Sequence, residues 1–356
     1  MKRRIISAAL LLICFCFLAV LTGAIPVTTE ARASSGEAAA EPEDFPADEP
    51  KPEASPDPTE EPDPGPAPAP PPETAEPVPE TAVPDPEPAP EKIDPPEAAV
   101  PEDTPPRLVT TTIPADELLD NDTYYELDAR ELLSEGVSFS LPPEGYQILI
   151  LHTHTTEAYT PSEDDRYDTD DPYHSLDPAH SVVKVGDVLA EALSAYGLNV
   201  LHDTTVYDHP SYTGSYSRSG EGAAALLEAW PGIRLVIDLH RDALGDEDVI
   251  YRTAADVDGA DAAQLMLVVG SDLNMEHPGW MDNLRLALTL QEVVRAQYPS
   301  LMRPVSLSGY RYNQQLCPGS LLLEVGTAGN TLAQAEEAVR LFAEAAGPVI
   351  ASWIGD

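Results

Sequence analysis

Residues 147–157 read QILILHTHTTE. The first five residues form an apolar run that follows Pro-Pro-Glu-Gly, a pattern typical of a short buried strand that begins after a turn. His152, His154 and Glu157 follow this run directly. Because polar side chains are costly to bury without a purpose, the stretch predicts a strand of a parallel sheet with functional residues at its carboxyl end.

The chain after this strand alternates predicted strands and helices. Apolar runs predict further strands at residues 199–201, 233–239, 265–269 and 321–323, and helical spacing of apolar residues predicts helices at 182–196, 223–230, 280–298 and 331–346. This alternation predicts an α/β domain with a mostly parallel central sheet and helices on both of its faces.

Two more of these predicted strands end in polar residues. The strand at 233–239 leads into Asp238, His240 and Asp242, and the strand at 321–323 leads into Glu324. The carboxyl ends of parallel strands meet at one edge of a sheet, so these side chains are expected near those of 152–157.

Histidines and carboxylates at these strand ends suggest a zinc site. Zinc binds imidazole and carboxylate, and a catalytic zinc keeps one position open for water. We therefore expect Zn²⁺ to be held by His154, Glu157 and His240. Glu324 is the expected catalytic base that accepts the proton of the zinc-bound water.

Other residues near the expected site are given supporting roles. His152, Asp238 and Asp242 are close enough in sequence to orient the imidazole rings. The remaining histidines of the domain are interpreted as structural: His174, His180, His202 and His209.

Composition separates the chain into parts. Residues 34–106 hold 24 of the 38 prolines and 21 acidic residues, with few large apolar side chains, which predicts a disordered linker. The folded domain is then expected at 107–356. The net charge of -43 argues against binding to nucleic acid, because a polyanion would be repelled.

The N-terminal segment, residues 1–33, has the features of a membrane anchor. Three basic residues at positions 2–4 precede an uncharged, mostly apolar run at 5–29. Its length and basic flank favour a single transmembrane helix with the domain outside the cytoplasm. A cleaved signal peptide, processed near Ala31-Arg32-Ala33, is the alternative.

Seven separate blocks resemble one known family. They are HTHTTEAY (152–159), VGDVL (185–189), HDTTV (202–206), PSYTGSYSR (210–218), IDLHRDA (237–243), RYNQ (311–314) and LEVGTAGNT (323–331). In this order they are similar to stage II sporulation protein P, a family of zinc-dependent peptidoglycan hydrolases, over residues from about 108 to the C-terminus.

This resemblance implies a fold, an activity and a location. The fold would be that of cell-wall amidases, related to zinc carboxypeptidases. The activities would be N-acetylmuramoyl-L-alanine amidase and endopeptidase cleavage of peptide cross-links. The protein would act at the septum between forespore and mother cell during engulfment, with the sporulation transglycosylase protein D and the membrane protein M as partners.

The resemblance also implies roles for the residues of the expected site. His154 and His240 match the histidine ligands of the amidases, and Glu324 matches their catalytic glutamate. In the wider amidase group the third ligand is a glutamate that opens the helix beginning here near His180, where no carboxylate stands. Glu157 is the expected substitute, and His152 or His180 are the alternatives.

Two other functions remain open from the sequence. A zinc carboxypeptidase on a similar fold would need an arginine to bind the terminal carboxylate of its substrate, and Arg241 and Arg218 are the nearby candidates. A non-catalytic module that binds the cell wall or serves as a scaffold would not need Glu324.

Overall fold

The computed structural model describes residues 106–167, 173–246 and 248–355, which belong to one compact unit, Glu91–Asp356. The predicted anchor, 1–33, and all of the predicted linker except its last residue lie outside the described residues. Within the part that is described, no helix combines the length and the apolar character needed to cross a membrane.

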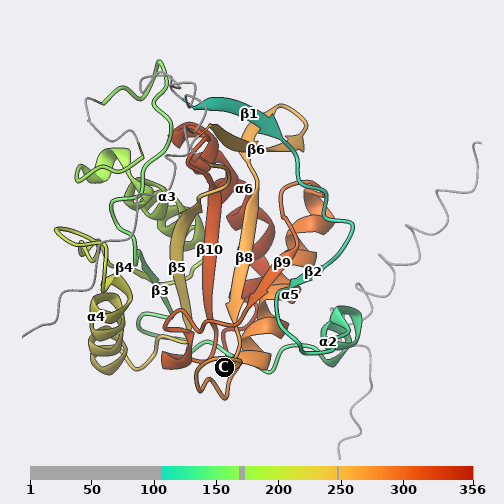
Figure 1. Ribbon diagram of the computed structural model, residues 1–356. Coiled ribbons are helices and arrows are strands. Elements are labelled where there is room, and N and C mark those ends of the chain that lie inside the picture. Colours follow the sequence, from blue (N-terminus) through green and yellow to red (C-terminus); the bar gives the residue numbers. More distant parts are fainter. Residues whose placement is uncertain (1–105, 168–172, 247, 356) are drawn as a thin grey trace, which may run out of the picture. The chain divides into compact units, whose positions relative to one another are not determined.

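The described chain forms ten strands and five α-helices (Figure 1). In order they are β1 (Arg107–Thr111), β2 (Leu119–Asn121), α2 (Ala129–Glu135), β3 (Ile148–Leu151), α3 (Val182–Ser194), β4 (Val200–His202), α4 (Ser215–Ala229), β5 (Leu235–Asp242), β6 (Val249–Val257), β7 (Ala260–Ala263), β8 (Leu265–Gly270), α5 (Trp280–Gln297), β9 (Val305–Ser308), β10 (Ser320–Thr327) and α6 (Leu332–Ala351). Single turns of 3-10 helix lie at Pro178–His180 and Gln314–Leu316.

Seven strands form the central sheet, in the order β2-β9-β8-β10-β5-β3-β4. Five of its six pairings are parallel, as the sequence predicts, and the pairing of β10 with β8 is antiparallel. The sheet is therefore mixed: β4, β3, β5 and β10 run in one direction, and β8, β9 and β2 run in the other.

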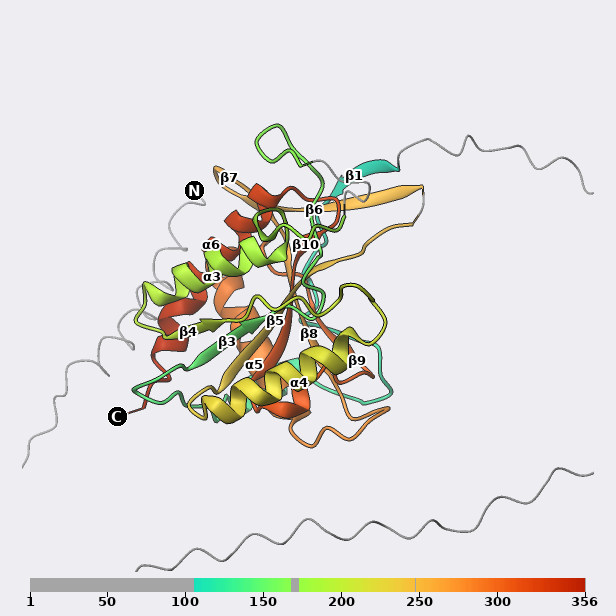
Figure 2. The ribbon, with the colours of Figure 1, turned by 90° about the vertical axis from the view of Figure 1, so that its left-hand side faces the viewer.

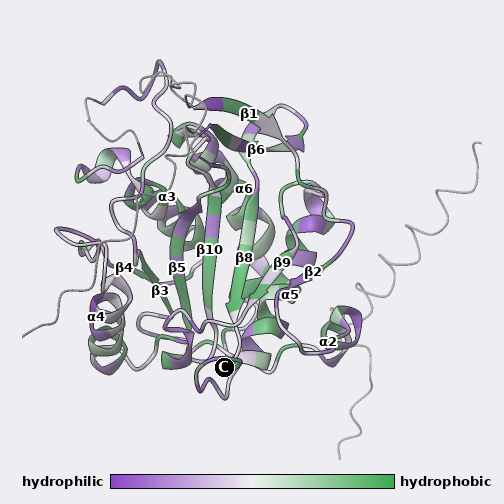
Figure 3. Ribbon diagram, viewed as in Figure 1, coloured by the Kyte–Doolittle hydropathy of each residue, from purple (hydrophilic) through white to green (hydrophobic). Residues whose placement is uncertain are grey.

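Helices cover both faces of the sheet (Figure 2). Alternate residues of β3 separate the two layers, because side chains of a strand point to opposite faces. Ile148 and Ile150 pack into the large core, with α3, α5 and α6, whereas Leu149 and Leu151 pack into a smaller cluster that includes Ala223 of α4. Figure 3 shows that the central strands are largely hydrophobic and that β5 becomes hydrophilic along its length.

A second sheet, in the order β1-β6-β7, lies near the carboxyl ends of β5 and β10 (Figure 1). β1 pairs with β6 in parallel and β7 pairs with β6 in antiparallel fashion. After β5 and a short loop the chain returns to this sheet as β6, so the small sheet and that loop border the end of the central sheet where the polar residues gather.

Candidate functional site

Register and strand periodicity bring the polar residues of β5 and β10 onto one face. Glu324 stands opposite His240 in the parallel pairing of β10 with β5. Leu239 packs into the large core, so its neighbours Asp238 and His240 point to the other face, the one that carries α4. The site is thus built on the α4 face of the sheet, at the carboxyl ends of the strands.

His154 and His240 face each other in this site. Their ring centres are 5.3 Å apart with the planes at 83°, and the residues are only 7% and 3% exposed. Tyr212 stacks flat on His154, with ring centres 4.3 Å apart, and the Tyr216 ring meets His154 edge to face at 5.6 Å. The two tyrosines therefore cover His154 from the solvent side and from α4.

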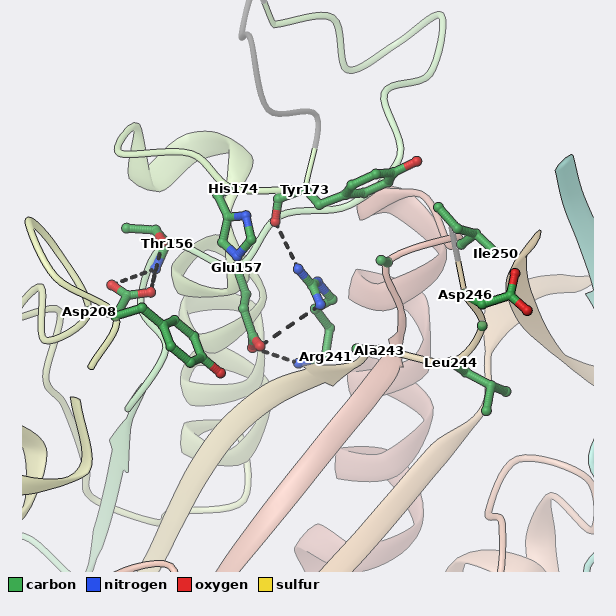
Figure 4. Close-up of a pocket in the computed structure, with 13 residues that line it drawn as sticks. Thr156, Glu157, Tyr173, His174, Asp208, Arg241, Ala243, Leu244, Asp246 and Ile250 are labelled. Carbon is green, nitrogen blue, oxygen red and sulfur yellow. Dashed lines mark hydrogen bonds and ion pairs between the residues drawn. The ribbon is translucent and has the colours of Figure 1, made fainter. Parts of the chain in front are cut away.

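Glu157 lies beside Arg241 (Figure 4) and also contacts His240. Its Oε2 accepts a hydrogen bond from the backbone N–H of Arg241 at 3.1 Å and lies 3.4 Å from His240 Nδ1. The Arg241 guanidinium is 3.9 Å from Oε1. Burial pushes the pKa of Glu157 upward, but Arg241 and His240 outweigh it and lower the pKa to about 2. Glu157 is therefore ionised.

Asp238 supports His240 from the other side of the ring. Asp238 Oδ1 forms an ion pair with His240 Nε2 at 3.0 Å, although Nε2 makes no hydrogen bond to the described residues. Thr153 donates to Asp238 through its backbone N–H at 2.8 Å and its hydroxyl at 2.6 Å. Burial lowers the pKa of His240, but the two carboxylates beside it raise the pKa well above its usual value.

Glu324 has the opposite electrostatic setting. Its side chain is partly exposed overall, yet Oε2 is buried and finds no hydrogen-bond partner among the described residues. Burial raises the pKa of Glu324 to about 8, against the lowering effect of His240. Glu157 and Glu324 therefore hold their protons at very different pH, the arrangement by which one site provides both an ionised carboxylate and a proton carrier.

The donor atoms suit a metal ion in pairs. His154 Nδ1 and Glu324 Oε2 are buried without partners in the described structure. On one tetrahedral zinc, the centres of two imidazole rings are about 5 Å apart, and a nitrogen ligand and an oxygen ligand are about 3.3 Å apart. The ring centres of His154 and His240 are 5.3 Å apart, and His240 Nδ1 lies 3.4 Å from Glu157 Oε2. No group of three donors in the described ranges is already arranged to hold a metal. The spacing of the donors therefore suits zinc for the pair His154 and His240 and for the pair His240 and Glu157, taken one pair at a time.

His152, one alternative ligand, is engaged elsewhere. Its Nδ1 lies 2.9 Å from the Leu239 carbonyl, to which it donates, and its Nε2 lies 2.8 Å from His202 Nε2. Gly186 makes room for this pair, since a Cβ there would lie 2.5 Å from His202 Nε2 and 2.8 Å from His152 Cε1. Both ring nitrogens of His152 already have partners, and the expected role of orienting the site's imidazoles is not seen.

Two further expectations differ from the structure. His180, the other alternative ligand, contacts Asp165 through Nδ1 at 2.5 Å and is not brought to His154 or His240. Asp242 accepts from Arg303 at 2.7 Å and does not orient an imidazole, because the end of β5 turns it toward that arginine. The structure thus brings together the four residues expected to form the site and leaves these two outside it.

Sequence reasoning missed the aromatic wall of the site and the support of Glu157. Arg218 holds the loop that carries Tyr212, donating to the carbonyls of Tyr207, Ser211 and Thr213. Arg241 donates to the carbonyls of Ala158 and Tyr173 at 3.0 and 2.9 Å, so its side chain is fixed beside Glu157. The sequence block at 210–218 contains both tyrosines and Arg218, but the spacing of these residues does not predict which ring a tyrosine in a loop will cover.

A cavity of about 670 Å³ opens beside Glu157, and we call it the arginine pocket. Its lining includes Arg241, Asp208, Asp246 and Tyr212, together with Leu244 from the β5–β6 connection and Ile250 from β6 (Figure 4). Asp208 is held in place by the backbone N–H and the hydroxyl of Thr156. Glu157, one of the expected ligands, thus borders a space large enough for a substrate group.

Known proteins resemble this chain in sequence and, weakly, in structure. Stage II sporulation protein P of Bacillus subtilis (strain 168) is 28% identical over 208 residues, which cover 55% of this chain and 49% of that relative. The chain therefore spans about half the length of the curated relative that it matches. The N-acetylmuramoyl-L-alanine amidase AmiC2 of Nostoc punctiforme is 12% identical with a TM-score of 0.33 and covers 58% of this chain and 97% of its own.

A second solved structure gives a similar weak likeness. The CwlD amidase of Clostridioides difficile, solved in complex with the GerS lipoprotein, is 14% identical with a TM-score of 0.36, over 58% of this chain and 98% of its own. The family assignment rests on the sequence instead. Residues 70–347, more than half of the chain, match the family model of stage II sporulation protein P, and the chain therefore belongs to the stage II sporulation protein P family.

Proposed function

We propose that this chain is a peptidoglycan hydrolase of sporulation that cleaves the N-acetylmuramoyl-L-alanine amide bond, with endopeptidase activity on peptide cross-links. The observation that carries the proposal is the pair of buried histidines, His154 and His240, flanked by Glu157 and Glu324 at the carboxyl ends of three parallel strands. Membership of the family supports the setting in sporulation.

The proposed metal is Zn²⁺, held by His154, Glu157 and His240. When bound it would lower the pKa of a water molecule and polarise the amide carbonyl. Asp238 orients the His240 ring through its contact with Nε2, so that Nδ1 faces Glu157. Arg241 and the backbone around it fix the Glu157 carboxylate.

Glu324 is the proposed proton carrier. Its buried Oε2 has no competing partner in the described structure, so it is available to a water or a leaving amine. As a carboxylate with a raised pKa it is a strong proton acceptor, and as the acid it donates to the amine that leaves. Tyr212 and Tyr216 limit the access of bulk water to His154, which strengthens electrostatic interactions in the site.

The contacts of the two candidate arginines argue against a carboxypeptidase. Arg241 is buried, and its guanidinium is committed to Ala158, Tyr173 and Glu157. Arg218 is committed to the carbonyls of its own loop. Neither side chain is free to bind the carboxylate of a substrate in the bidentate manner that such an enzyme uses.

The proposal includes a location and partners, which come from the sequence and the family. The segment 1–33 would anchor the chain in the membrane, and 34–106 would hold the domain away from it in the extracytoplasmic space at the septum. Sporulation proteins D and M would be the partners. Deletion of 34–106 should leave hydrolysis of soluble muropeptides unchanged and impair function at the membrane.

The test is product analysis on purified peptidoglycan with the full chain. Released stem peptides with a free N-terminal L-alanine, identified by mass spectrometry, would support the amidase. Release of single amino acids would support a carboxypeptidase, and wall binding without products would support a scaffold module. Either result would refute the proposal.

Glu324→Gln tests the mechanism. Turnover should fall by roughly 10²–10⁴-fold, because glutamine cannot carry the proton, while zinc content measured by atomic absorption persists. His154→Ala and His240→Ala should lose zinc as well as activity. Glu191→Gln is the matched control, since Glu191 is exposed on α3, away from the site. Turnover near that of the wild type in Glu324→Gln would rule out this role for Glu324.

A further inference from the structure

A second cavity, of about 640 Å³, lies between the start of α4 and the segment 310–316, and the proposed chemistry does not use it. We call it the tyrosine pocket. Its lining includes Tyr216, Glu221, Met275, Tyr310, Arg311 and Gln315. Three of its apolar side chains, those of Tyr310, Met275 and Leu316, are 63%, 46% and 37% exposed, so large hydrophobic groups gather here in contact with solvent.

The tyrosine pocket adjoins the candidate site through one side chain. Tyr216 lines this pocket, and its ring meets His154 at 5.6 Å. Tyr212 lines the arginine pocket, and its ring stacks on the same histidine at 4.3 Å. The two pockets therefore approach His154 from different sides, as the two halves of a substrate joined by the cleaved bond would require.

The backbone of the tyrosine pocket is held in an unusual conformation. Tyr312 and Asn313 both adopt positive φ angles, 48° and 59°, which L-residues adopt at a cost and which cluster at functional sites. Asn313 donates from its amide to the Tyr216 carbonyl at 2.7 Å, and Gly220 leaves space for it, since a Cβ there would lie 2.9 Å from Asn313 Oδ1. The pocket is thus fixed against α4 before any ligand arrives.

The lining suits a neutral ligand with both apolar faces and polar edges. Tyrosine rings provide flat apolar surfaces. Gln315 lines the pocket and is partly exposed, and its Oε1 has no hydrogen-bond partner among the described residues, so a small rotation of this side chain would let Oε1 accept from a ligand. Arg311 and Glu221 carry opposite charges, so the pocket does not select strongly for a charged group. Sugar rings with hydroxyl and N-acetyl groups combine these properties, because their C–H faces stack on aromatic rings and their amide and hydroxyl hydrogens are donors.

We propose that the tyrosine pocket is a subsite for an N-acetylated sugar of the glycan strand, on the sugar side of the cleaved amide. The position of the sugar relative to the cleaved amide rests on the proposed function, whereas the binding of an N-acetylated sugar is inferred from the residues that line the pocket. Stacking on Tyr310 and a hydrogen bond to Gln315 Oε1 hold the sugar, and Tyr216 forms the boundary between the bound sugar and His154.

The test is binding of a peptide-free probe, the N-acetylglucosamine tetramer, to the full chain by isothermal titration calorimetry. The probe has no sugar–peptide amide, so binding is measured without catalysis. Tyr310→Ala and Gln315→Leu should each raise Kd by about five- to tenfold through the loss of one stacking face or one hydrogen bond. Tyr124→Ala is the matched control, since Tyr124 is an exposed tyrosine outside the pocket, and its Kd should equal that of the wild type.

The outcomes separate this subsite from the proposed function. Unchanged Kd in both variants, or no binding of the tetramer to the wild type, would overturn the subsite even if the wild type hydrolyses peptidoglycan. Displacement of the tetramer by a free stem peptide would assign the pocket to the peptide side instead and also overturn it. A wild type that binds the tetramer through Tyr310 and Gln315 but does not hydrolyse peptidoglycan would keep the subsite and refute the hydrolase.

Discussion

Consider Glu324→Gln in the full chain with divalent cations removed by a chelator. In the wild type, burial raises the pKa of Glu324 from 4.5 to about 8 in the folded state. When the folded-state pKa is the higher one, the associated stability is fully present below the unfolded pKa and is lost as pH rises through the folded pKa. The buried carboxylate therefore destabilises the wild type at alkaline pH, and glutamine, which does not ionise, removes that effect.

The structure limits how much the free energy of unfolding can differ between Glu324→Gln and the wild type. One pKa unit corresponds to ~1.4 kcal/mol, so the interval from 4.5 to about 8 gives an upper limit of about 5 kcal/mol. The side chain is partly exposed, and relaxation reduces the value further. We expect the variant to be more stable by about 2 kcal/mol at about pH 8.5 and equal to the wild type at about pH 4.5. Since Oε2 has no partner in the described structure, the substitution breaks no hydrogen bond there.

Urea unfolding followed by far-ultraviolet circular dichroism at several pH values measures this difference. The exposed Glu191→Gln should show no such change with pH. If Glu324→Gln is less stable than the wild type at alkaline pH, or if the difference is the same at acid and alkaline pH, the buried carboxylate does not have the electrostatic setting described here.

Three further substitutions test the surroundings of the site. Asp238→Asn should weaken zinc binding by about 10–100-fold in a competition titration with a chromophoric chelator, because the charge behind His240 is lost; unchanged affinity would show that Asp238 does not orient the ring. Arg241→Met should lower the free energy of unfolding by about 3 kcal/mol, since it removes one of the two positive groups beside the buried Glu157 and two hydrogen bonds to backbone carbonyls; a loss below ~1 kcal/mol in urea titration would contradict this pairing. Cys317 is buried with its pKa raised to about 11, so in a chain whose other cysteines are replaced by serine, a thiol reagent should label it only in urea, and rapid labelling of the folded chain would refute its burial.

The strands and helices with strong local periodicity are predictable from the sequence. α3 and α5 begin at Val182 and Trp280, the first residues of the predicted helices. α4 begins at Ser215, eight residues before the predicted start at 223, because Gly220 and Gly222 weaken the local helical signal. Packing requires these glycines: a Cβ at Gly222 would lie 2.0 Å from the Tyr207 hydroxyl. Local propensity and tertiary contact disagree there, and the contact decides the structure.

Other features depend on contacts that no local pattern contains. The antiparallel direction of β8 and the small β1-β6-β7 sheet are set by pairings between distant segments. For the site, strand ends are enough to predict that His154, Glu157, His240 and Glu324 gather. The partners of Glu157 and the ring that covers His154 are not predictable in this way, because they come from loops whose course follows from the completed fold.

The space above Gly186 has a consequence for how sequences of this family can vary. A methyl group there would overlap both imidazoles of the His152–His202 pair. An alanine at 186 therefore requires both rings to shift or both histidines to be replaced by smaller residues. Positions 152, 186 and 202 should change together among relatives, with few sequences that combine an alanine at 186 with histidines at both 152 and 202.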